Sequence, residues 1–158
     1  MTVTLFTLDG TRMETDRVLE ASADWQAGSP AAQFSAVLPG ENWPEELVTV
    51  RWKDDSGFTL FEGYLDTAAQ VLDSDGPRLE VTARSAGCYL LDNEALPQSY
   101  DSVTLDSFCQ RYLDSYGIFR RGFSYRGRIP YTVPKGQSEW EALAGFVYAL
   151  TGKFPYLS

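Results

Sequence analysis

The chain has 158 residues, a formal net charge of −9, a hydrophobic content of 44% and an aromatic content of 14%, and it contains no histidine. This length fits one domain or two small ones, and the aromatic content excludes a disordered chain. Without histidine, Ser-His-Asp and Cys-His catalytic sites are impossible, and two cysteines are too few for a zinc site. The composition therefore favours a protein that is not an enzyme and that holds no metal and no cofactor.

The charge is distributed unevenly along the chain. Residues 1–100 hold 17 acidic and 6 basic residues, whereas residues 101–158 hold 5 acidic and 7 basic residues. An acidic surface repels nucleic acid phosphates and anionic lipid headgroups. No apolar run reaches the length of a transmembrane helix, and the N-terminus lacks the basic and apolar regions of a secretion signal. We therefore expect a protein partner, no specific nucleic acid and no membrane.

The first ninety residues read as short strands separated by turns. Asp9-Gly10 and Pro39-Gly40 are typical turn dipeptides, and apolar and polar residues alternate between them. Gly63, inside a long strand, indicates a bulge or a bend. The expected strands span residues 3–8, 18–23, 32–38, 47–53, 58–71 and 79–83. Such strands without intervening helices predict a small antiparallel β-barrel or a sandwich, and we take the barrel as the expected fold.

The hydrophobic period then changes to that of helices. Apolar residues from Leu105 to Tyr116 lie on one helical face, after Thr104 as a candidate N-cap. A second helix begins with the capping box of Ser138 and Glu141. A strand at 129–133 separates the two helices. The predicted fold class is thus mainly β with an α+β C-terminal part: a barrel domain over residues 1–92 and a helix–strand–helix domain over residues 93–158.

The end of the chain reads as one more strand, at residues 153–157. Either this strand pairs with the strand at 129–133, or the natural protein continues and the chain is a fragment.

Two acidic pairs and the two cysteines have the residue types of small functional sites. The pairs Asp54/Asp55 and Asp73/Asp75 have the residue types of a glycosidase or a Ca²⁺ site. Both pairs lie in turns, where aspartate hydrogen-bonds to its own backbone, so turn chemistry is the preferred interpretation. The two cysteines, Cys88 and Cys109, lie among apolar residues and are expected to be buried free thiols.

The candidate protein interface is a loop within residues 120–128 that is rich in arginine and aromatic residues. Arginine pairs with carboxylates and stacks on rings, so this loop suits an acidic protein surface. One alternative is a solvated loop whose aromatic side chains pack on the barrel. Single-stranded nucleic acid is a weaker alternative, because four arginines in an otherwise acidic chain bind phosphates poorly. The candidate interface residues are Arg120, Arg121, Phe123, Arg126 and Arg128.

Tryptophan residues offer a second kind of binding surface. Trp52 lies on an alternating strand and is expected in the core. Trp25 and Trp43 lie near turns and remain open as a platform for stacking a carbohydrate.

Several segments, in order along the chain, resemble the tail hub (baseplate hub) proteins of contractile-tailed phages and prophages, a family related to type VI secretion spike proteins. The first is Phe61-Glu62-Gly63-Tyr64-Leu65, and the second runs from Glu80-Val81-Thr82-Ala83-Arg84-Ser85 to Leu91-Asp92. The third is a helix from Thr104-Leu105 to Tyr116-Gly117. The last is Val133-Pro134-Lys135-Gly136-Gln137-Ser138 followed by Trp140-Glu141-Ala142-Leu143.

The resemblance implies a structural role without catalytic residues. It implies a ring subunit that joins the tail tube to the spike, with tube and spike proteins as partners and a homotrimer in the assembled tail. The location implied is the virion tail, after assembly in the bacterial cytoplasm. Family members are longer and carry a second barrel. A small β-barrel module that binds a carbohydrate or a peptide is the alternative function.

Overall fold

A computed structural model describes residues 1–118 and 125–157 of the chain. These residues form two compact units, each described here by itself. The first unit comprises Met1–Trp25 and Ala32–Ser85, and the second comprises Gln26–Ala31 and Ala86–Ser158. The later boundary between the two units thus lies between Ser85 and Ala86. The sequence analysis predicted a domain boundary after Asp92.

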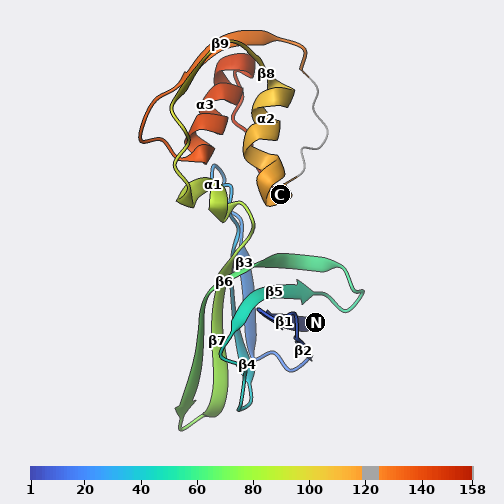
Figure 1. Cartoon of the computed structure of the whole chain (residues 1–158). Coiled ribbons are helices and arrows are strands. Elements are labelled where there is room, and N and C mark those ends of the chain that lie inside the picture. Colours follow the sequence, from blue (N-terminus) through green and yellow to red (C-terminus); the bar gives the residue numbers. More distant parts are fainter. Residues whose placement is uncertain (119–124, 158) are drawn as a thin grey trace. The chain divides into compact units, whose positions relative to one another are not determined.

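The first unit is one antiparallel sheet of seven strands (Figure 1). The strands are β1 (Thr2–Thr7), β2 (Arg12–Thr15), β3 (Glu20–Asp24), β4 (Gln33–Pro39), β5 (Leu47–Lys53), β6 (Thr59–Asp73) and β7 (Gly76–Arg84). Their hydrogen-bonded order is β2-β1-β5-β6-β7-β4-β3. All the strands predicted in this region are present, and β2 is an addition that the sequence analysis did not predict. The order ends at β2 and β3, so the sheet is not closed and the predicted barrel is not confirmed.

Strand β6 connects two halves of this sheet. Its first part pairs with β5 as far as Tyr64, and from Tyr64 to Asp73 it pairs with β7. The buried side chains on the inner side of both halves form one core cluster. It consists of Val3, Leu5, Ala32, Phe34, Ala36, Leu38, Leu47, Val50, Phe61, Leu79, Val81 and Ala83. The sheet therefore folds around a core to which both of its halves contribute.

Gly63 does not form the bulge that the sequence analysis allowed. It pairs in register with Val50, and the irregularity lies further on, between Leu65 and Thr67. A Cβ atom at Gly63 would lie 2.3 Å from the carbonyl oxygen of Arg84. Glycine is therefore required there for the close approach of two strand backbones.

The second unit packs three helices with a two-stranded sheet (Figure 1). Its elements are α1 (Cys88–Asp92), β8 (Gln98–Thr104), α2 (Leu105–Leu113), the 3₁₀ turn η1 (Asp114–Tyr116), β9 (Arg128–Val133) and α3 (Glu139–Thr151). Both predicted caps are confirmed. The Thr104 hydroxyl accepts from the Ser107 amide, and Ser138 and Glu141 form the full capping box. The mainly β class with an α+β C-terminal part is therefore confirmed.

The predicted strand at 153–157 is wrong. Strand β9 already pairs with β8, and Pro155 has no N–H to donate to a ladder. The segment instead packs by side chains. Phe154 stacks on Tyr148 with ring centroids 4.6 Å apart, and Leu157 packs against the core of the unit.

Cys88 and Cys109 are buried and are not joined by a disulfide, as expected. Within the described part of the chain, no helix is long and apolar enough to cross a membrane.

Candidate functional site

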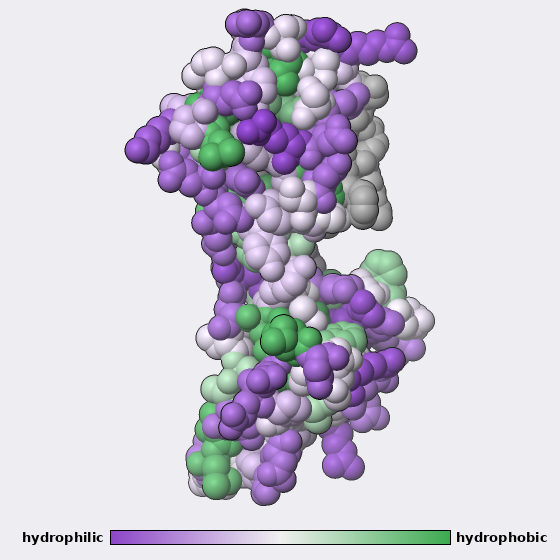
Figure 2. Space-filling model, viewed as in Figure 1, coloured by the Kyte–Doolittle hydropathy of each residue, from purple (hydrophilic) through white to green (hydrophobic). Residues whose placement is uncertain are grey.

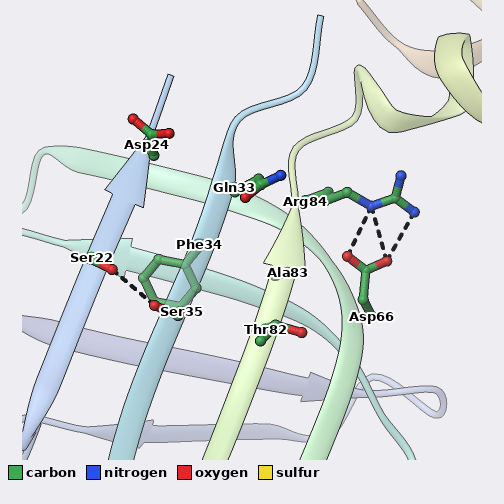
Figure 3. Close-up of a pocket in the computed structure, with 9 residues that line it drawn as sticks. All are labelled: Ser22, Asp24, Gln33, Phe34, Ser35, Asp66, Thr82, Ala83 and Arg84. Carbon is green, nitrogen blue, oxygen red and sulfur yellow. Dashed lines mark hydrogen bonds and ion pairs between the residues drawn. The ribbon is translucent and has the colours of Figure 1, made fainter. Parts of the chain in front are cut away.

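The outer face of the first unit carries a polar depression of about 350 Å³ over strands β3, β4, β7 and β6 (Figure 3). Side chains of these strands alternate between the core and this face, so the lining follows from the period of two. The polar residues that line it are Ser22, Asp24, Gln33, Ser35, Asp66, Thr82 and Arg84.

A row of hydroxyl groups crosses all four strands. Ser22 pairs with Ser35, Ser35 with Thr82, and Thr82 with Thr67 in the strand registers. The hydroxyl oxygens of Ser22 and Ser35 are 2.9 Å apart, and those of Thr67 and Thr82 are 2.7 Å apart. Cross-strand hydroxyl pairs of this kind stabilise a sheet modestly. They also give the face a continuous line of donors and acceptors.

An ion pair flanks this row. Asp66 is the extra residue at the irregularity of β6, between the registered residues Leu65 and Thr67. Its carboxylate accepts from Arg84 Nε at 2.9 Å and from Arg84 Nη2 at 3.0 Å (Figure 3). The two side chains are 38% and 30% exposed, so the pair adds at most about 1 kcal/mol to stability. The bulge serves to direct Asp66 toward Arg84 on the next strand.

The chemistry of this face is hydrogen bonding. No histidine, cysteine or lysine lines the depression. The serine and threonine hydroxyls bond to one another, and Arg84 engages the carboxylate of Asp66. Within the described residues, no group of three or more Cys, Asp or Glu side chains is placed to hold a metal ion.

The acidic turns behave as the turn interpretation predicted. The Asp54 carboxylate accepts from the Ser56 hydroxyl at 2.6 Å and from the Ser56 and Phe58 amides at 2.9 Å. These hydrogen bonds, that from the Ser56 hydroxyl above all, lower the pKa of Asp54. Asp73 accepts from Arg78 at 2.7 Å and from the Asp75 amide at 3.0 Å, and Arg78 is the main cause of the lowered pKa of Asp73.

The structure does not bring Trp25 and Trp43 together. Trp25 comes directly after Asp24, which pairs with the first residue of β4, whereas Trp43 lies four residues beyond Pro39, the last residue of β4. The strand of seven residues separates them, at about 3.3 Å per residue. Trp25 is 53% exposed, while Trp43 is partly buried against the core cluster. No joint stacking platform is formed. Trp52 contacts the core, as predicted, with its ring centroid 5.6 Å from that of Phe34.

The candidate arginine interface is described in part. Arg126 and Arg128 are exposed, and Arg128 lies at the start of β9, opposite Thr104. Arg120, Arg121 and Phe123 lie outside the described residues, so their place in an interface stays a prediction.

The polar depression itself was missed by sequence reasoning. The alternation of Ser22, Ser35 and Thr82 with apolar neighbours indicates a solvent-facing side for each strand. What joins them is the non-local pairing of β4 with β7, which no local pattern contains.

Parts of two tail proteins among the solved structures share this fold. The chain superposes on the tail protein from Neisseria meningitidis MC58 with a TM-score of 0.73 at 16% identity, over 99% of this chain and 47% of that protein. The 43 kDa tail protein of prophage MuSo2 from Shewanella oneidensis gives 0.67 at 15% identity, over 95% of this chain and 49% of that protein. No protein-family model and no curated sequence matches the chain.

These likenesses establish the fold. The chain has the fold of about half of each tail protein, and it spans about half of their length.

Proposed function

We propose that the chain is a structural subunit of a phage or prophage tail, and more specifically of the baseplate hub, where it forms part of the ring that joins the tail tube to the spike. The observation that carries this proposal is the likeness over 99% of the chain to a tail protein, at a TM-score of 0.73. Its place is then the virion tail, after assembly in the host cytoplasm.

The partners proposed are tail tube and spike proteins, and further copies of the chain in a homotrimer. Specific nucleic acid and membrane are not among them, because residues 1–100 carry a large excess of acidic side chains. This acidic part suits the exposed guanidinium groups of Arg126 and Arg128 on a neighbouring subunit, together with Arg120, Arg121 and Phe123.

Disruption of the gene in the strain that carries it tests the role. Induced particles of the deletion strain are expected to lack an attached spike in electron micrographs, and the wild-type gene supplied in trans is expected to restore it. Normal particles from the deletion strain would contradict the hub role. A glycan array with the purified chain tests the alternative of a carbohydrate-binding module, for which we expect no specific signal.

The arginine interface has its own test. The double variant Arg126→Glu/Arg128→Glu is compared with Lys135→Glu/Lys153→Glu, which changes the net charge by the same amount. If the arginines bind an acidic neighbour, the arginine variant weakens self-association in sedimentation experiments at low salt, and the lysine variant does so much less. Equal effects of the two variants would mean that net charge alone acts.

A further inference from the structure

The second part of β6 forms a free edge of the sheet. From Leu65 to Asp73 the strand pairs with β7 on one side. The pairing with β5 on its other side ends at Tyr64, and no other described strand takes its place. On that side the Gln70 side chain donates to the Trp43 carbonyl at 2.8 Å.

This edge lacks the usual protection against pairing. Natural edges carry charges, and β3 has Glu20 and Asp24 while β2 has Arg12 and Glu14. Residues 67–72 of β6 read Thr-Ala-Ala-Gln-Val-Leu and carry no charge. Leu72 is 78% exposed. Figure 2 shows hydrophobic colour along the border of the sheet where Figure 1 has the β6–β7 hairpin.

We propose that the β6 edge of one copy pairs with the β3 edge of a second copy, so that the sheet continues from chain to chain. The inference rests on the proposed function, in which copies of the chain assemble, and it names the surface that they use. The partner is therefore a second copy of this chain, joined head to tail.

Strand direction fits such a joint. The strands β6, β7, β4 and β3 are neighbours in this order, and each pair is antiparallel. Because their number is even, β3 runs opposite to β6. A second copy added head to tail thus places its β6 antiparallel to β3 and continues the alternation. Head-to-tail contacts of this kind build rings or open helices.

The side chains at the two edges match on the core side. There β3 and the residue before it present Leu19, Ala21 and Ala23, and the β6 edge presents Ala68, Gln70 and Leu72. With Glu20–Asp24 placed opposite residues 67–71, Leu19 would lie opposite Leu72 and Ala23 opposite Ala68. Apolar cross-strand neighbours of this kind are favourable.

Charge favours this joint over symmetric ones. The five residues of β3 fit within the uncharged residues 67–72, so that neither Glu20 nor Asp24 lies directly opposite an acidic residue. A two-fold pairing of β6 with β6 over the same stretch would set Asp66 beside Asp73. A two-fold pairing of β3 with β3 would set Glu20 beside Asp24. Like charges placed opposite each other destabilise a strand pair.

Lysine substitutions at matched exposed leucines test the proposal. Leu72→Lys places a charge on the β6 edge, and Leu19→Lys places one beside the β3 edge. The control is Leu8→Lys, in the β1–β2 turn, where the leucine is 75% exposed. In sedimentation equilibrium of the full chain, we expect the edge variants to raise the dissociation constant by about tenfold or more. The control variant is expected to associate like the wild type.

A mixing experiment separates head-to-tail from symmetric pairing. The Leu72→Lys chain keeps an intact β3 edge, and the Leu19→Lys chain keeps an intact β6 edge. A mixture of the two variants is therefore expected to form a capped heterodimer, although each variant alone stays monomeric.

Three results would overturn the edge pairing. They are a wild type that stays monomeric up to about 1 mM, variants that all associate alike, and a Leu19→Lys chain that associates as well as the wild type. None of them touches the proposed tail role, which the gene disruption tests separately.

Discussion

The two units of the chain bury their apolar side chains in different ways. The core of the first unit is mainly aliphatic and lies inside one bent sheet. The core of the second unit is aromatic, with Phe108 stacked on Phe146 at a centroid distance of 4.2 Å. Tyr112 and Tyr131 lie around the same Phe108 ring, at 5.0 and 5.5 Å.

The units also differ in how their backbone N–H and C=O groups find hydrogen-bond partners. The helices of the second unit satisfy most of their hydrogen bonds internally, and caps complete those of α2 and α3. The outer strands of a sheet keep one row of backbone N–H and C=O groups unpaired unless another strand pairs with them. The first unit retains free edges at β2, at β3 and along β6. Among the described residues, the second unit relies mainly on helices and has open edges only in its two-stranded sheet, whereas nearly all of the first unit's regular structure is sheet and ends in several open edges.

The largest effect is expected from a substitution in the core of the second unit. Phe146 is fully buried, and Phe146→Ala removes its stack on Phe108. We expect a loss of about 3–5 kcal/mol in the free energy of unfolding, measured by denaturant titration with circular dichroism. Tyr148→Ala, at a 50% exposed position on the same helix, is the control and should lose far less. Equal losses would contradict the aromatic core.

A smaller but still large effect is expected in the first unit. Gly63→Ala places a Cβ atom 2.3 Å from the Arg84 carbonyl oxygen, so β6 or β7 must shift. We expect a loss of about 2–3 kcal/mol in the same titration. Thr59→Ala, at an exposed position of the same strand, should be nearly neutral. A stable Gly63→Ala protein would show that the strands do not approach as described.

Trp140→Phe tests whether the segment Gln26–Ala31 belongs to the second unit. The indole Nε1 of Trp140 donates to the Gly28 carbonyl at 3.0 Å, within a unit that includes Gln26–Ala31. Loss of this hydrogen bond should cost about 1–2 kcal/mol and speed amide exchange in Gln26–Ala31. The control is Trp25→Phe, at a 53% exposed side chain. Unchanged amide exchange of Gln26–Ala31 in Trp140→Phe would show that this segment is not part of the second unit.

The smallest effect concerns the β6–β7 turn. Hydrogen bonds from Arg78 and the Asp75 amide lower the pKa of Asp73. The charged form thus stabilises the fold above the unfolded pKa of about 4, and this contribution is lost as the pH falls through the folded pKa. Asp73→Asn should lower the melting temperature at pH 7 by at most about 3 °C. At pH 2 to 3 the difference should vanish, and Asp75→Asn is the control. A difference that persists in acid would contradict the ion pair.

Much of the fold followed from local patterns in the sequence. The period of two marked Leu47–Lys53, and the helical period with its caps marked α2 and α3. The short helix α1 was missed because five residues are too few for a periodic signal. The strand predicted at 153–157 failed because apolar content alone does not supply a pairing partner.

The site was much less predictable. Asp66 reaches Arg84 because of a register shift in β6, and the hydroxyl row depends on four strands aligned across non-local pairs. Register and pairing are properties of the whole sheet, so no window of the sequence contains them. The free edge of β6 is not predictable from the sequence for the same reason, because it follows from where the pairing of β6 with β5 ends.

Amide hydrogen exchange of the wild-type chain at increasing protein concentration tests the central claim most directly. The account predicts that protection increases at Glu20–Asp24 and at residues 67–72, both in the first unit, and stays constant throughout α2 and α3. Protection that increases in the second unit instead, or nowhere at any concentration, would contradict the claim that the sheet edges of the first unit are the assembling surface.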